Sequence, residues 1–200
     1  SAPLLNSADP RAWAAARDSY ARALDFLAAK KKDPKKLQGL DAWYHQAKKP
    51  NVKTYELDRE TLSKIVEWKL SRGTFRPGLL QKAQSNNEKA VRDAYVKARD
   101  LLLGAADDDA NEVAVQAVNA LAKLFGVGPA TATAVLSRYF PGLVAFMSDD
   151  AMLECGLFGR PADIKYDMKT FRRFNEIVRD KARILNASGG KACWSGDDVA

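Results

Sequence analysis

Apolar residues along this chain recur at intervals of three and four, which is the spacing of one face of an α-helix. The clearest example runs from Glu88 to Leu103, where the apolar side chains form one stripe and Gly104 follows the last of them. No convincing series of segments shows the alternation of apolar and polar residues that half-buried strands require. We therefore expect an all-α fold.

Capping residues and prolines divide the rest of the chain into further helices. Asp9 and Pro10 begin a stripe that ends in the lysine run at 30–32, and Asp33-Pro34 begins the next one. Further helices are expected after Asp58, at Leu79 and Leu80, from Asn111 to Phe125 and from about Met168 to Leu185. We interpret residues 1–187 as one domain and residues 188–200, with few apolar side chains and several glycines, as a flexible C-terminal tail.

Residues 115–139 have the pattern of two helices joined by a tight turn. Gly126 can adopt the positive φ that helix C-termini favour, and Gly128 lets the backbone pass close to another chain. Pro129 suits the first turn of a new helix, whose unpaired amides attract phosphate. The candidate phosphate-binding residues are Gly126, Val127, Gly128, Pro129, Ala130 and Thr131.

Two adjacent aspartates, Asp149 and Asp150, follow the turn by about two dozen residues. Ser148 is a good N-cap, and acidic residues are favoured in a first helical turn, so capping alone would explain the pair. The same positive potential keeps a carboxylate ionised, and a fixed negative charge stabilises the oxocarbenium-like sugar that forms when a base is removed. Both interpretations remain open at this point.

The stretch from Leu121 to Asp150 resembles the helix-hairpin-helix motif of the DNA glycosylase superfamily. LFGVGPATA fits the hairpin, and the Phe146–Asp150 segment is similar to the Phe-Leu-Pro-Asp-Asp segment of the bacterial alkyladenine glycosylase branch. With Gly126 as the first position, Asp150 is the twenty-fifth, where that branch has its catalytic carboxylate. The resemblance implies a two-lobed helical fold that binds duplex DNA and excises a damaged base, with Asp150 or Asp149 as the catalytic residue.

The resemblance also implies a cation site, and this chain departs from the family at several positions. The backbone carbonyls of Phe125 and Val127 would ligate a structural monovalent cation. Ala130 replaces the lysine of members that also nick the DNA backbone, so no lyase step is expected. Alanine also replaces the pocket aromatics of the alkyladenine branch, at Ala130, Ala134 and Ala151. A nucleic-acid-binding module that keeps the hairpin without chemistry is therefore the alternative to an enzyme.

A second candidate region is EWKLSRGTFRP, residues 67–77. Its cations can contact phosphate and its aromatic rings can stack an unpaired base, although such mixtures also occur in ordinary cores. The candidate DNA contacts here are Lys69, Arg72 and Arg76. The candidate base pocket, which replaces the missing family aromatics, is formed by Trp68, Phe75 and Tyr139.

Composition restricts the partners and cofactors. Thirty-two basic against 25 acidic residues give a net charge of +7, which favours a polyanionic partner, although a helical protein-interaction domain is a third alternative. Cys155 and Cys193 are too few for a four-thiolate iron-sulfur cluster and indicate no disulfide framework. His45 is the sole histidine, which excludes a metal site of several histidines. We expect no cofactor beyond the cation at the hairpin.

The sequence shows no sign of a membrane span or of an export signal. No apolar run reaches eighteen residues, and no charged segment followed by an apolar one opens the sequence. We expect no membrane span and an intracellular monomer, located in the nucleus of a eukaryote or in the cytoplasm or nucleoid of a bacterium.

Overall fold

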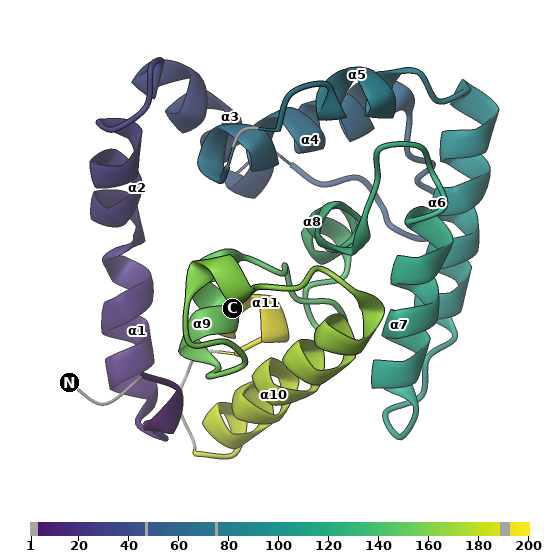
Figure 1. Ribbon diagram of the computed structural model, residues 1–200. Coiled ribbons are helices and arrows are strands. Elements are labelled where there is room, and N and C mark those ends of the chain that lie inside the picture. Colours follow the sequence, from purple (N-terminus) through teal and green to yellow (C-terminus); the bar gives the residue numbers. More distant parts are fainter. Residues whose placement is uncertain (1–3, 47, 75, 189–192) are drawn as a thin grey trace.

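The computed structural model describes residues 4–46, 48–74, 76–188 and 193–200. These residues form α-helices and two short 3-10 turns, and no strand occurs among them (Figure 1). The all-α expectation is therefore confirmed. Within the same ranges, no helix is both long and apolar enough to cross a membrane. Phe75, one of the expected base-pocket residues, lies outside the described residues.

The helices follow one another with short connections. In chain order they are η1 (Leu4–Asn6), α1 (Pro10–Asp18), α2 (Tyr20–Ala28), α3 (Pro34–Gln46), α4 (Arg59–Arg72), α5 (Leu79–Gln84), α6 (Glu88–Leu103), α7 (Ala110–Leu121), α8 (Pro129–Tyr139), α9 (Asp149–Glu154), η2 (Pro161–Asp163), α10 (Met168–Ala187) and α11 (Gly196–Val199). Helices α6 and α7 pack as neighbours, α7 also contacts α10, and α4 contacts α3, α5 and α8.

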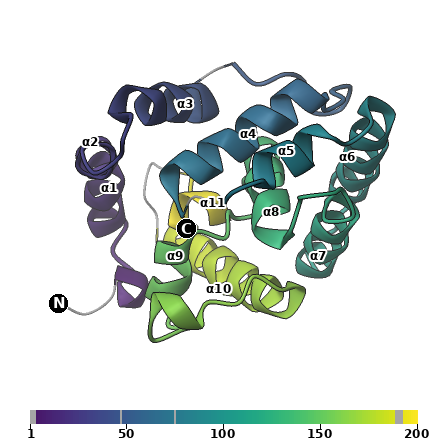
Figure 2. The same cartoon turned by 45° about the horizontal axis from the view of Figure 1, so that its top comes forward.

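Helix α8 is the centre of the molecule (Figures 1 and 2). All its residues from Ala130 to Tyr139 are buried, because α7 and α4 both pack against it. The small residues in its first two turns allow these neighbours to approach closely. At its N-terminus, however, Gly128 is exposed, so the turn that precedes α8 reaches the surface. One continuous hydrophobic cluster extends from this helix into α4, α6, α7 and α10.

Helix boundaries differ from the sequence-based expectation at two places. The expected first helix is divided at Ser19 into α1 and α2. Ser19 Oγ donates a hydrogen bond of 2.7 Å to the Ala16 carbonyl and so competes with the backbone hydrogen bonds of a continuous helix. Helix α7 ends at Leu121 and not at Phe125, because the Leu124 amide donates to the Leu121 carbonyl at 3.0 Å and tightens the chain toward the turn.

The expectation of a flexible C-terminal tail is corrected for residues 193–200. Trp194 is only 3% exposed and packs edge to face on Trp13, with ring centres 6.5 Å apart. Asn186 accepts a hydrogen bond from the Trp194 amide at 2.7 Å and donates one to its carbonyl at 2.9 Å. Ser195 and Asp198 form a capping box that begins α11. One large aromatic side chain therefore anchors a segment that is otherwise poor in apolar residues.

Candidate functional site

The two glycines of the turn between α7 and α8 have different surroundings. Gly126 has a φ of 75°, and a Cβ placed on it would lie 2.6 Å from Cβ of Lys82 in α5. The positive φ expected there is confirmed, and the turn can pack on α5 only because no side chain intervenes. A Cβ placed on Gly128 would meet nothing within 4 Å. The close approach expected at Gly128 is thus made by Gly126, while Gly128 faces open space.

Several backbone amides of the turn are available for a ligand. The amides of Gly126, Gly128 and Ala130 have no acceptor among the described residues. The Thr131 amide, in contrast, donates to the Gly128 carbonyl at 3.0 Å, so it is less available than the sequence suggested. Free amides at the start of α8, together with the helix dipole, make this surface attractive to an anion.

Asn86, which precedes α6, fastens the turn through its side-chain amide. Its Oδ1 accepts a hydrogen bond from the Phe125 amide at 2.9 Å, and its Nδ2 donates one to the Phe125 carbonyl at 2.8 Å. A carbonyl oxygen has two lone pairs, so this bond leaves the Phe125 carbonyl one lone pair for the monovalent cation expected at the Phe125 and Val127 carbonyls. The side chain of Asn86 fastens the turn at Phe125 whether or not a cation binds there.

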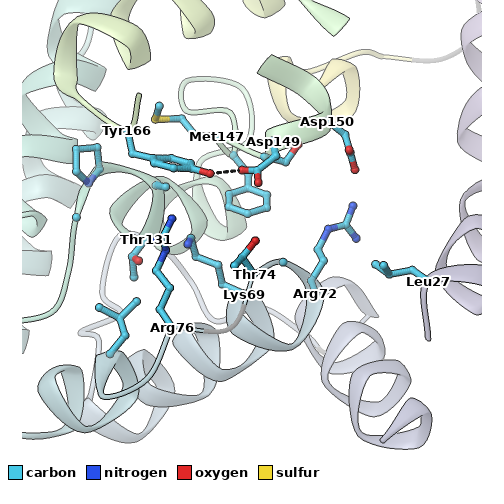
Figure 3. A pocket seen from close by; sticks show the side chains of 17 residues that line it. Leu27, Lys69, Arg72, Thr74, Arg76, Thr131, Met147, Asp149, Asp150 and Tyr166 are labelled. Carbon is cyan, nitrogen blue, oxygen red and sulfur yellow. Dashed lines mark hydrogen bonds between the residues drawn. The ribbon is translucent and has the colours of Figure 1, made fainter. Parts of the chain in front are cut away.

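A cavity of about 480 Å³ lies beside the turn (Figure 3). Its walls come from the C-terminal end of α4 and the loop after it, the N-terminus of α8, the segment that leads into α9, and Tyr166. It is lined by both aspartates and all three cations that the sequence singled out, namely Asp149, Asp150, Lys69, Arg72 and Arg76. Gly128, Pro129, Ala130 and Thr131 complete the wall on the hairpin side.

The two aspartates occupy the first turn of α9 but differ in their contacts. Ser148 is the N-cap, as expected, and its hydroxyl accepts a hydrogen bond from the Ala151 amide at 3.2 Å. Asp149 accepts a hydrogen bond of 2.6 Å from the Tyr166 hydroxyl, shown as a dashed line in Figure 3. Burial and this bond raise the pKa of Tyr166 to about 12, so the phenol stays protonated. Asp150 is exposed and has no hydrogen-bond or ion-pair partner within the described ranges.

The three cations also differ in their contacts. Arg72 donates a hydrogen bond of 2.6 Å to the Tyr20 hydroxyl and lies 3.7 Å from a carboxylate oxygen of Asp41. Arg76 is exposed, with its guanidinium carbon 5.8 Å from the centre of the Tyr166 ring. Lys69 is half-buried, and burial lowers the pKa of its amine despite the opposing charge of Asp149. In Figure 3 Lys69 and Arg76 extend toward Tyr166, and Arg72 extends toward Asp150.

Asp41, which the sequence did not single out, fixes Arg72 from beneath the cavity. Its carboxylate is 3% exposed and accepts hydrogen bonds from Trp68 Nε1 at 3.0 Å and from the Tyr20 hydroxyl at 2.8 Å. A buried carboxylate needs such partners, and together they hold the Arg72 guanidinium at the cavity wall. Nothing local in the sequence indicates this network, since its members come from α2, α3 and α4.

Two of the residues expected in the base pocket, Trp68 and Tyr139, do not line the cavity. Trp68 is 1% exposed and stacks on Tyr44 with ring centres 3.6 Å apart, so it belongs to the core. Tyr139 is also buried, in contact with Tyr55 and Tyr95. Trp68 is buried because it lies on the face of α4 that packs into the core, and Tyr139 is buried because α8 is covered on all sides. Among the described residues, the aromatic side chains that line the cavity are those of Phe146 and Tyr166.

Comparison with known proteins gives no assignment. No protein-family model matches the chain, and neither the curated proteins nor the solved structures contain a match. The function therefore has to be inferred from the geometry of the cavity and the turn.

Proposed function

We propose that this chain is a helix-hairpin-helix protein that binds DNA and excises a damaged base by hydrolysing its N-glycosidic bond. The observation that carries the proposal is that the N-terminus of α8 and the pair Asp149 and Asp150 line the same cavity. A turn that holds a phosphate then brings the adjacent sugar near a carboxylate. The hairpin and the acids lie about two dozen residues apart in sequence, and the fold joins them.

The proposed DNA contacts begin at the turn. The unpaired amides of Gly128 and Ala130 hold a backbone phosphate, and the open space above Gly128 lets the strand approach the backbone directly. Arg76, exposed at the cavity wall, adds a second phosphate contact. These contacts set the position of one nucleotide without reading the sequence of the DNA.

The cavity then receives the base of that nucleotide. Its volume of about 480 Å³ is within the range of about 300–1,000 Å³ that is usual for small-molecule sites. Phe146 and Tyr166 supply aromatic surface for an extruded base. They take the place of the aromatic residues that the alkyladenine branch has at positions where this chain has alanine.

Asp150 carries the chemistry in this proposal. As the bond between C1′ and the base nitrogen breaks, its electron pair leaves with the base and positive charge develops on the sugar. The unpaired carboxylate of Asp150 stabilises that charge, and water then adds to C1′ and releases a proton to solvent. A neutral base leaves as an anion and takes up a proton from solvent, so the hydrolysis balances. Asp149, which is tied to Tyr166, is a positioning residue that holds the phenol against the cavity.

The polar groups of the cavity suit neutral lesions. Its described walls carry three cationic side chains, of which Arg72 is paired with the buried Asp41, and two carboxylates. An alkylated purine, which is itself cationic, gains no net attraction from such a set of charges. A neutral deaminated or oxidised base offers carbonyl oxygens that the same cations can bind. We therefore propose neutral damaged bases as the substrate class.

Excision is tested with duplexes that each carry one deaminated, oxidised or alkylated base. We expect release of free base, with strand cleavage only after alkali, from one of the neutral lesions. Asp150→Asn should abolish release while DNA binding persists. Asp108→Asn is the matched control, because Asp108 is an exposed acid of the α6–α7 connection that does not line the cavity. Activity that survives in both Asp149→Asn and Asp150→Asn would refute the proposed chemistry.

The second candidate is a nucleic-acid-binding module without catalysis. It is favoured by the capping role of Ser148, which by itself explains why acids begin α9. On this hypothesis none of the damaged duplexes releases a base. The affinity for nucleic acid depends on Gly128 and Arg76 but not on Asp150. Comparing DNA with RNA of the same sequence would then identify the preferred ligand.

A further inference from the structure

Helix α2 packs on α1 and α3 and presents two cations and an aromatic ring on its outer face. Arg22 and Phe26 lie four residues apart, so they share one face of the helix, and Lys30 continues that spacing into the turn after α2. All three are exposed, Phe26 to 66%, and the Lys30 ammonium lies 3.9 Å from the centre of the Phe26 ring. These three residues, which we call the α2 stripe, place an apolar ring between two positive charges.

The α2 stripe lies beside the cavity, because two residues next to it in the chain are fixed there. Leu27 lines the cavity, and the Lys31 ammonium donates hydrogen bonds of 3.0 Å to the carbonyls of Arg72 and Gly73, which are also residues of the wall. Figure 3 shows Leu27 at one end of the cavity and Thr131, from the first turn of α8, at the opposite end. DNA that crosses the cavity from the hairpin therefore reaches α2.

The charges around the α2 stripe suit a polyanion. Residues 22–36 include six lysines and arginines against two aspartates. One of these acids, Asp25, accepts a hydrogen bond from Gln38 at 2.8 Å, whereas Arg22 and Lys30 form no ion pair among the residues that the structure describes. Lysines at the end of a helix are favoured by the helix dipole, but Arg22 lies in the first turn of α2, where the dipole disfavours a cation. Helix capping therefore does not explain the stripe.

The hairpin turn carries the same combination of an exposed ring and a lysine. Phe125 is 60% exposed, and Nζ of Lys82 in α5 lies 5.7 Å from the centre of its ring. Phe26 and Phe125 are the exposed phenylalanines of the described ranges, and they belong to the elements at the two ends of the cavity. A nucleic-acid backbone presents apolar sugars and negative phosphates side by side, so it fits such pairs. An anionic membrane would fit the same chemistry but does not require that the pairs flank a cavity.

We infer that the α2 stripe is a second DNA-contact surface, which binds the backbone of the duplex that flanks the nucleotide at the cavity. This inference rests on the proposed function, because it takes DNA as the ligand of the hairpin. Arg22 and Lys30 bind phosphates, and Phe26 packs against the sugar between them. The α2 stripe then adds affinity that depends on salt and on the length of the DNA but not on its sequence.

The test uses duplexes with one tetrahydrofuran residue, which has no base, so that binding does not depend on excision. One duplex has long flanks on both sides of this residue, and in two others one flank or the other is cut short. We expect the unmodified protein to bind several-fold more weakly when the flank that reaches α2 is removed, and to lose less when the other is removed. Fluorescence anisotropy at several salt concentrations measures each affinity and its salt dependence.

Two variants of the stripe separate charge from apolar contact. The double variant Arg22→Gln/Lys30→Gln should bind the long duplex several-fold more weakly and lower the slope of log affinity against log salt by about two. Phe26→Ala should also weaken this binding but leave the slope unchanged, because it removes no charge. On the duplex that lacks the flank at α2, both variants should bind as the unmodified protein does.

Each variant has a matched control elsewhere on the surface. Lys89→Gln/Lys97→Gln removes two exposed lysines of α6, and Ile184→Ala truncates an apolar side chain of α10 that is 47% exposed. None of these residues lines the cavity. Neither control should change the affinity ratio between the long and the shortened duplexes. Thermal unfolding verifies that all four variants are folded.

Failure of this inference and failure of the proposed function give different results. Unchanged binding of the long duplex by both variants of the stripe, or an equal loss on every duplex, would overturn the contact at α2 and leave DNA binding at the hairpin intact. Absence of binding by the unmodified protein to any duplex would overturn the proposed function and this inference with it. Binding to vesicles of phosphatidylserine and phosphatidylcholine that both variants lose, with their DNA affinity unchanged, would assign the stripe to a membrane surface instead.

Discussion

Gly126 and Gly128 lie two residues apart, yet a methyl group has opposite consequences at the two sites. At Gly126 it would be 2.6 Å from Lys82 Cβ on a backbone with positive φ. We expect Gly126→Ala to lower the free energy of unfolding by roughly 2 kcal/mol or more, since clash and strain add. Urea unfolding measures the difference. A loss below about 0.5 kcal/mol, the usual effect of a surface substitution, would contradict the packing of the turn on α5.

Gly128→Ala is the complementary variant, because it changes the surface without disturbing the fold. Its Cβ meets nothing within 4 Å, so the free energy of unfolding should change by less than about 0.5 kcal/mol. The added methyl group would stand between the turn and a DNA strand, and binding measured by fluorescence anisotropy should weaken at least several-fold. Unchanged affinity would show that DNA does not approach this part of the backbone.

Asp197 makes the stability of the protein depend on pH. It lies next to Phe146, a residue of the cavity wall. Its carboxylate accepts a hydrogen bond of 3.0 Å from the Phe146 amide, and burial raises its pKa from 3.8 to about 6. The folded-state pKa is therefore the higher one. As the pH rises from about 4 to 6, the unfolded chain loses this proton first, so this group's contribution to the free energy of unfolding falls.

Asp197→Asn removes that titration while keeping an oxygen that can accept the Phe146 hydrogen bond. We expect the variant to gain stability relative to the unmodified protein as the pH rises from 4 to 6, by at least about 1 kcal/mol at pH 7. Chemical unfolding at several pH values gives the difference and cancels the other titrating groups. A difference that stays constant with pH would mean that Asp197 is not buried in solution.

Residue-scale features were predictable where the signal is local. Ser148 as N-cap and Gly126 at positive φ follow from residue type and from the immediate neighbours. Asn86, in contrast, meets a residue 39 positions away, and the partners of Asp41 come from two other helices. Side-chain networks of this kind depend on how helices pack, which hydrophobic periodicity does not specify.

At the scale of elements, long amphipathic helices were predicted well because each repeats its apolar stripe over several turns. Helices α6 and α10 are examples. The break at Ser19 was missed because the apolar stripe continues through it. Helix α11 was missed because it has four residues and depends on the burial of Trp194 against Trp13. Short elements are set by tertiary contacts and leave little periodicity to detect.

The attachment of the hairpin to the α5–α6 connection can be tested at Asn86. Asn86→Ala removes both hydrogen bonds to Phe125 and should cost about 1–3 kcal/mol. Asn87→Ala is the matched control, since Asn87 only caps α6 and should cost about 1 kcal/mol. Hydrogen exchange of the Phe125 amide should accelerate in the first variant beyond what its global stability explains, but not in the second.

Equal acceleration in both Asn variants would mean that the turn is held by the rest of its packing. The result also bears on the cation that the family resemblance implies. If Asn86 replaces the cation, replacing sodium with potassium in the buffer should leave the stability of the unmodified protein unchanged. A potassium-dependent rise in melting temperature that persists in Asn86→Ala would identify the Phe125 and Val127 carbonyls as ligands.

For the whole molecule, the net charge of +7 describes affinity for polyanions but not where they bind. Several cations on outer helix faces are paired, such as Arg172 with Glu112 and Arg59 with Glu88. Lys69 and Arg76, in contrast, line the cavity without an ion pair among the residues that the structure describes. Two cations without an ion pair therefore lie beside the hairpin, a position that the composition alone could not indicate.

That distribution makes a quantitative prediction for DNA binding. Each phosphate contact releases condensed counterions, so the slope of log affinity against log salt changes by about one when one contact is removed. We expect Arg76→Gln to reduce the slope by that amount, and Lys97→Gln, at an exposed lysine of α6 that does not line the cavity, to leave it unchanged. Titrations at several salt concentrations measure both slopes. Equal slopes for the two variants would mean that the DNA lies on another face, because only a phosphate held beside the hairpin requires the charge of Arg76.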